Sequence, residues 1–160
     1  MNKQHLDQFY SRVTQDNNLE IFTLSLPMLL ITKNFHNNSE NFYKSNYDLL
    51  HSDIDVLAAL YFTNDKHSLT PTELYDATVF SSGGMTKVLK KLEDRELIKR
   101  EVSTEDKRKT YVTLTKEGVN LLQDCIEKTS LRLNDSFKVL NKNEQKDLKR
   151  ILEKLLYSLI

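Results

Sequence analysis

The spacing of apolar residues along the chain predicts a protein built mostly from helices. Apolar side chains recur at helical spacing over residues 4–15, which predicts a short first helix. Residues 18–36 are apolar on nearly every face, and such a helix is normally buried on several sides, as at a subunit interface. Pro27 either kinks this helix or marks its first turn. The polar run over residues 37–46 is predicted to be a loop.

Two short helices are predicted in the middle of the chain. Residues 53–62 carry one apolar face, with Ser52 or Asp53 as the N-cap. The sequence Thr-Pro-Thr-Glu at residues 70–73 is a capping box with proline at the first helical position, so it predicts a helix that runs through Ala77.

A third helix and then a change of period follow. Ser81 is a candidate N-cap, although this serine also suits a phosphate contact. The helical period ends after this helix: residues 97–102 and 110–114 are predicted to be strands, and the charged run between them predicts a hairpin tip. The inner face of the helix consists of Met85, Val88, Leu89 and Leu92.

Two helices are predicted after the hairpin. One extends from Thr115 to about Phe137, and a capping box at residues 141–144 starts the last. Little of the chain remains to cover the apolar face of this last helix, so a helix of a second subunit is the simplest cover. That face consists of Leu148, Ile151, Leu152, Leu155, Leu156 and Leu159.

Composition and charge narrow the class of protein. The 160 residues carry 23 basic and 23 acidic side chains, and they include three Gly, two Pro and one Cys. Residues 51–80 hold one basic and five acidic side chains, whereas residues 81–110 hold nine and six, so a zero net charge does not exclude DNA. There is no apolar segment typical of a signal peptide or a membrane span, so we expect a cytoplasmic protein without a membrane partner.

Catalytic and metal-binding patterns are missing from the sequence. It has no Gly-rich phosphate loop and no paired-carboxylate signature, and its four histidines lack the spacing of metal ligands. We therefore expect no enzyme, no catalytic residues, no metal and no cofactor.

The order of elements over residues 53–114 is helix, short helix, helix and two-stranded hairpin. A helix-turn-helix followed by a hairpin wing is an arrangement that binds double-stranded DNA. The predicted fold class is mainly α with a small β-hairpin wing: a winged helix-turn-helix with N- and C-terminal dimerisation helices. We assign residues 1–46 to dimerisation, 47–115 to DNA binding and 116–160 to dimerisation.

From Tyr47 to about Leu122 the sequence resembles the MarR family (multiple-antibiotic-resistance regulators) of dimeric winged-helix transcription factors. The matching segments are DLLHSDIDVLAAL, LTPTELYDAT, SSGGMTKVLKKLEDRELIKR and EDKRKTYVTLTKEG. Asp48 and Glu96 depart from the family pattern because each stands where glycine is common. If the turn at Glu96 requires a positive φ, this residue is strained.

The resemblance implies a homodimeric repressor on a pseudo-palindromic operator, and it implies a role for each residue that matches. Ser81, Ser82, Thr86 and Lys87 match recognition-helix positions that meet DNA, and Lys90 and Lys91 match phosphate contacts. Arg108 matches the wing-tip arginine that enters the minor groove. Asp106 matches the acidic residue that orients such an arginine. Arg100 matches a basic position on the first wing strand, or it pairs with Asp106.

Other interpretations stay open. The three lysines are also compatible with a solvated helix face, and Asp106 and Arg108 with a plain hairpin ion pair. The resemblance implies an effector pocket for a small, often aromatic, anion near Phe35, Tyr43, Tyr47 and Tyr61, yet each of these also suits core packing. Cys125 suits a buried apolar position better than a redox switch. A winged helix that binds a protein instead of DNA is the main alternative function.

Overall fold

The protein is described by a computed structural model covering residues 3–15, 19–78, 84–104 and 106–159. The chain divides into two compact units, Met1–His51 and Ser52–Ile160. The predicted assignment of roles to residues 1–46, 47–115 and 116–160 stays a prediction. No helix among the described residues has the length and apolar character needed to cross a membrane.

The first unit contains two helices, α1 (Lys3–Val13) and α2 (Phe22–Tyr47). Pro27 lies inside α2, where it cannot donate a hydrogen bond to the carbonyl of Thr23. The hydroxyl of Tyr10 lies 3.5 Å from that carbonyl oxygen. The helix ends at Asp48, which has the left-handed conformation with φ of 53°.

The predicted loop over residues 37–46 is wrong, because α2 continues through it. Polar composition misled the prediction: the segment contains no glycine or proline, and its amides bond within the helix. Asn38 donates from Nδ2 to Oδ1 of Asn34 at 2.8 Å, and Asn46 donates to the carbonyl of Phe42 at 2.8 Å. These contacts span one helical turn, so the polar side chains are compatible with the helix.

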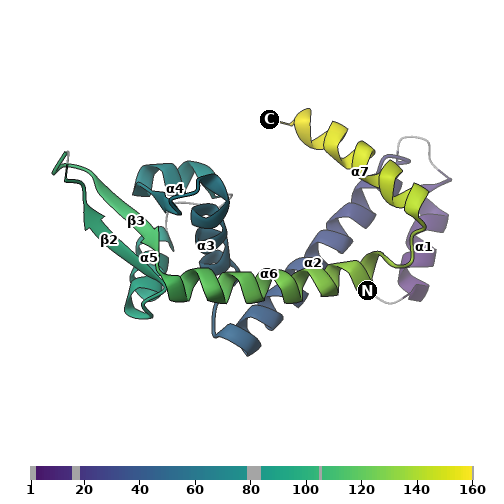
Figure 1. Ribbon diagram of the computed structural model, residues 1–160. Helices are drawn as coiled ribbons and strands as arrows, with labels where there is room; N and C mark the ends of the chain where they lie inside the picture. Colours follow the sequence, from purple (N-terminus) through teal and green to yellow (C-terminus); the bar gives the residue numbers. More distant parts are fainter. Residues whose placement is uncertain (1–2, 16–18, 79–83, 105, 160) are drawn as a thin grey trace. The chain divides into compact units, whose positions relative to one another are not determined.

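The second unit has the predicted winged-helix order with one additional strand. The strands β1, β3 and β2 form an antiparallel sheet in that spatial order, and Figure 1 shows β2 and β3 projecting as a hairpin beyond α5. The two residues of β1 are too few for a periodic signal, so the sequence did not reveal it. The elements are α3 (His51–Thr63), β1 (Ser68–Leu69), α4 (Pro71–Ala77), α5 (Met85–Asp94), β2 (Ile98–Val102), β3 (Thr110–Leu114), α6 (Lys116–Phe137) and α7 (Lys142–Tyr157).

Local signals fix the ends of several helices. Thr70 and Glu73 form the predicted capping box: Glu73 accepts from the backbone N–H of Thr70 at 2.7 Å, and its own N–H donates to the threonine hydroxyl at 3.3 Å. These hydrogen bonds stabilise the carboxylate and lower the pKa of Glu73. The helix α3 begins at His51, so Ser52 and Asp53 lie within its first turn and the predicted cap is wrong.

The core of the second unit holds the three short helices against the sheet. Met85, Leu89 and Leu92 on the inner face of α5 are buried as predicted, and Val88 is half-buried. Burial of these side chains fixes which face of α5 points outward. The other buried members of this core are Ile54, Val56, Leu57, Leu60, Leu69, Leu74, Leu97, Ile98, Val112, Leu114, Leu122 and Cys125.

Candidate DNA-binding interface

The outward face of α5 carries short polar and cationic side chains. Thr86, Lys87 and Lys90 are all exposed. The helix begins after Gly84, which has no side chain to cap it, so the amide N–H groups of the first turn suit an anion. The predicted contacts Ser81 and Ser82 lie outside the described residues.

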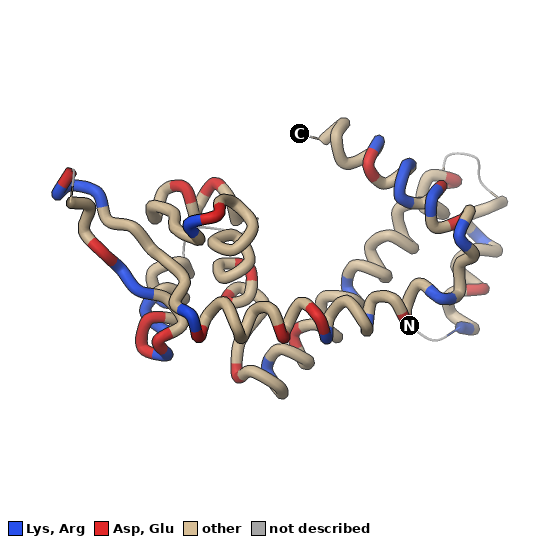
Figure 2. The backbone as a smooth tube through the Cα atoms, in the orientation of Figure 1, with Lys and Arg blue, Asp and Glu red and all other residues tan. Residues whose placement is uncertain are grey.

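The wing, which consists of β2, β3 and the tip at residues 103–109, ends in a tight turn. The N–H of Ser103 donates to the carbonyl of Lys109 at 2.8 Å and closes the tip. The carboxylate of Asp106 accepts from the backbone N–H of Arg108 at 3.0 Å, so it shapes the turn that carries this arginine. Lys107, Arg108 and Lys109 are exposed, and Figure 2 shows basic residues gathered at the tip.

Arg100 on β2 does not pair with Asp106. Its Nε lies 3.2 Å from Oε2 of Glu93 near the end of α5, so the alternative pairing with Asp106 is wrong. The sequence did not predict this contact with Glu93, because the two residues lie on different elements, 7 positions apart. This ion pair joins the end of the recognition helix to the wing.

Lys91 is also engaged within the protein. Its Nζ donates to Oδ2 of Asp53 at 2.7 Å. The side chain of Asp53 is only 2% exposed, whereas that of Lys91 is 37% exposed. This contact could not be predicted from the sequence, because the two residues lie 38 positions apart on α3 and α5.

Tyr43, Tyr47 and Tyr61, which were expected to line an effector pocket, each pack against a neighbouring aromatic ring. Tyr43 is buried, and its ring contacts that of His51 at a centroid separation of 5.4 Å. Phe35 and Tyr47 are half-buried. Tyr61, in the second unit, stacks on His67 with centroids 4.9 Å apart and accepts a hydrogen bond from Gln123.

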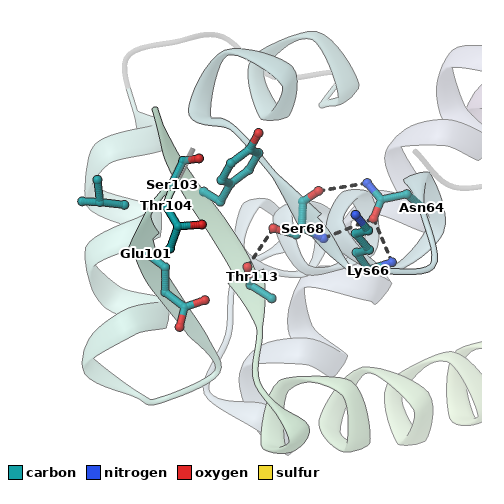
Figure 3. Close-up of a pocket in the computed structure, with 9 residues that line it drawn as sticks. Asn64, Lys66, Ser68, Glu101, Ser103, Thr104 and Thr113 are labelled. Atoms are coloured by element: carbon teal, nitrogen blue, oxygen red, sulfur yellow. Dashed lines mark hydrogen bonds between the residues drawn. The ribbon is translucent and has the colours of Figure 1, made fainter. Parts of the chain in front are cut away.

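A pocket of about 550 Å³ lies elsewhere, on the outer face of the wing sheet (Figure 3). The hydroxyls of Ser68 and Thr113 are 2.8 Å apart within it, and Asn64 donates to the carbonyl of Ser68 at 2.9 Å. The lining carries one acidic side chain, Glu101, and one basic side chain, Lys66, so it has no net charge that would favour an anion. The lining residues are Asn64, Lys66, Ser68, Glu101, Val102, Ser103, Thr104, Tyr111 and Thr113.

Cys125 lies buried in α6, and its surroundings oppose thiolate chemistry. Burial raises the pKa of the thiol, and its sulfur lies 4.0 Å from the hydroxyl oxygen of Thr129. A protonated, buried thiol reacts slowly with oxidants. Among the described residues, no group of three or more His, Cys, Asp or Glu side chains is placed to hold a metal ion.

Comparisons with known proteins identify the family. The family described as "Transcriptional regulator SarA/Rot" matches residues 39–125. The HTH-type transcriptional regulator PrsX of Escherichia coli is 33% identical over 110 residues, covering 69% of this chain and 66% of its own length. The organic hydroperoxide resistance transcriptional regulator of Bacillus subtilis is 30% identical, covering 74% of this chain and 76% of its own length.

The fold has a solved counterpart. A mutant of MarR from E. coli, complexed with operator DNA, superposes with a TM-score of 0.70 at 24% identity, covering 88% of this chain and 99% of that one. The sequence matches and the fold agree on one family. The chain belongs to the MarR/SarA family of winged-helix transcriptional regulators.

Proposed function

We propose that this regulator binds a pseudo-palindromic operator as a homodimer and represses transcription until a signal releases it. The observation that carries the proposal is the outward face of α5, where Thr86, Lys87 and Lys90 are exposed beside a wing that ends in three exposed cations. A recognition helix in the major groove and a wing tip in the adjacent minor groove suit this arrangement.

The proposed contacts divide by chemistry. Thr86 and Lys87, near the start of α5, reach base edges, and Lys90 neutralises phosphate. Arg108 enters the minor groove, with Asp106 holding the turn through its backbone. Ser81 and Ser82 remain proposed contacts from their place in the sequence. Arg100 contributes chiefly through Glu93, which its guanidinium already faces.

The proposed dimer rests on apolar side chains that the described chain leaves in solvent. The helix α7 has no buried residue, although Ile151, Leu152, Leu155 and Leu156 share one face of it and are each more than 40% exposed. A face of this kind is normally covered by a partner. Exposed apolar residues on and just before α2 add a second such surface: Ile21, Phe22, Leu24, Met28, Leu29 and Ile31.

The releasing signal that we propose is a small aromatic or anionic effector that binds beside Phe35, Tyr43 and Tyr47 on α2. The half-buried aromatic rings of Phe35 and Tyr47 supply surface on which such a molecule can stack. Its binding would change the spacing of the two recognition helices, so that both half-sites are no longer engaged together. A redox signal through Cys125 is disfavoured by the raised pKa of its buried thiol.

The function is tested by a gel shift with the DNA upstream of the protein's own gene, repeated across salt concentrations. The wild type should shift this fragment in preference to unrelated DNA. Arg108→Ala should bind more weakly, with a log Kd versus log[salt] slope shallower by about one unit if the arginine meets phosphate. Lys146→Ala, an exposed cation on α7, is the charge-matched control and should bind normally. Equal affinity for both DNAs would favour a protein-binding winged helix instead.

A further inference from the structure

Two adjacent lysines of α5 differ sharply in their surroundings. The side chain of Lys90 is exposed. The ammonium of Lys91 instead lies 2.7 Å from the carboxylate of Asp53, whose side chain is 2% exposed. The family resemblance gives both lysines the same role, as phosphate contacts, but their environments are not equivalent.

The burial of Asp53 favours keeping the ammonium of Lys91 beside this carboxylate over bringing it to a DNA phosphate. A buried carboxylate destabilises the fold unless a cation and hydrogen bonds compensate its charge. Removing the cation would leave the charge of Asp53 less compensated. Bringing a phosphate to the same ammonium would place a second anion near this carboxylate. The pair as a whole also carries no net charge, so it displaces few counterions from DNA.

The contact joins elements that must keep a fixed geometry. Asp53 lies in the first turn of α3, and Lys91 lies in the second half of α5. The Glu93–Arg100 ion pair links the same part of α5 to β2, although both of its side chains are more exposed than Asp53. The second half of α5 is therefore tied to α3 by one pair and to the wing by the other, and only the first pair includes a buried charge.

We infer that Asp53 and Lys91 form a positioning pair that fixes the rotation of the recognition helix against α3, and that Lys91 does not contact phosphate. This inference rests on the proposed function, in which α5 meets DNA. Binding sites hold their contacting side chains to within about 0.5 Å through such supporting residues. Asp53, an acidic residue without access to DNA, thereby becomes necessary for specific binding.

The test compares salt titrations of DNA affinity for the full-length wild type, Lys90→Gln, Lys91→Gln and Asp53→Asn. The probe is a duplex carrying the sequence that the wild type selects from random DNA, and a scrambled duplex reports non-specific binding. Lys90→Gln should make the log Kd versus log[salt] slope shallower by about 0.9. Lys91→Gln should weaken specific binding about tenfold without a shallower slope, as expected for a supporting residue.

Asp53→Asn tests the direction in which DNA affinity changes. Removing a buried anion behind the DNA-binding face should tighten binding through electrostatics alone, whereas loss of positioning should weaken specific binding about tenfold and spare the scrambled duplex. Lys91→Arg keeps the cation, so it should retain most of the specific affinity that Lys91→Gln loses. Thermal unfolding of each variant, at equal protein concentration, separates a positioning defect from a folding defect.

Three results would overturn the inference. A slope as shallow for Lys91→Gln as for Lys90→Gln would make Lys91 a phosphate contact and leave the proposed function intact. Unchanged or tighter specific binding by Asp53→Asn would remove the positioning role. An unchanged slope and affinity for Lys90→Gln would remove α5 from the interface and would overturn the proposed function as well.

Discussion

The backbone oxygen of Leu97 lies against the Cα of Gly118, so close that no Cβ fits between them. Leu97 also donates its N–H to the carbonyl of Leu92 at 2.9 Å and accepts from the N–H of Thr115 at 3.1 Å. One residue therefore joins the end of α5, the start of β2 and the first turn of α6. The absence of a side chain at residue 118 is what permits this junction.

Gly118→Ala should destabilise the protein. The added Cβ would meet a backbone oxygen that three elements hold in place, and the resulting shift should outweigh the helix propensity gained from alanine. We expect a loss of about 1–2 kcal/mol in the free energy of unfolding. Urea unfolding at fixed protein concentration measures it, with Gly84→Ala as control, because a Cβ there meets nothing within 4 Å. Equal losses of unfolding free energy in both variants would refute the predicted clash with the backbone of Leu97.

Glu96→Gly should stabilise the protein. Glu96 has φ of 56°, a left-handed conformation that costs a side-chain-bearing residue roughly 1–2 kcal/mol, and glycine removes most of that cost. A net gain of about 0.5–1 kcal/mol is expected in chemical denaturation. Glu96→Ala loses the carboxylate but keeps the Cβ, so it should not share the gain. The prediction fails if alanine and glycine stabilise equally.

Cys125 should make stability depend on alkaline pH. Burial raises the pKa of the folded thiol above the unfolded value of about 8.5. The stability that this neutral thiol contributes is therefore fully present below about pH 8.5 and is lost as pH rises through the folded pKa. The stability difference between wild type and Cys125→Ala should shrink above pH 8.5, by at most about 1.4 kcal/mol per pH unit.

The same burial predicts a slow reaction with thiol reagents and no effect of peroxide on DNA binding. Cys125→Ser is the comparison variant for the peroxide experiment. Rapid labelling of the native protein, or release of DNA by peroxide in the wild type alone, would instead support the redox interpretation.

Leu155→Glu should convert the proposed dimer into monomers. The leucine is 41% exposed on the apolar face of α7, and a carboxylate there would be desolvated in any interface formed by that face. Sedimentation velocity should show the monomer mass, and affinity for a two-half-site duplex should fall with it. Lys154→Glu, which changes charge on the polar face, should remain dimeric. Dimers of Leu155→Glu would place the interface elsewhere.

The sequence predicted those features that depend on near neighbours. The capping box at Thr70 and Glu73 and the inner face of α5 follow from spacing alone, and the structure contains both. The family resemblance raised a positive φ at Glu96 only as a condition, and the structure shows that the condition is met. The pairing of Lys91 with Asp53 did not follow, because it depends on how α3 and α5 pack.

Binding-site selection shows whether the protein recognises a two-fold symmetric operator, because the DNA that the wild type retains from a random pool is sequenced. A dimer that places one α5 in each of two half-sites should enrich a pseudo-palindrome with half-site centres about 10 base pairs apart. Lys87→Ala should relax the preference within each half-site. A pool without an enriched motif, or a motif with a single unpaired half-site, would contradict the account.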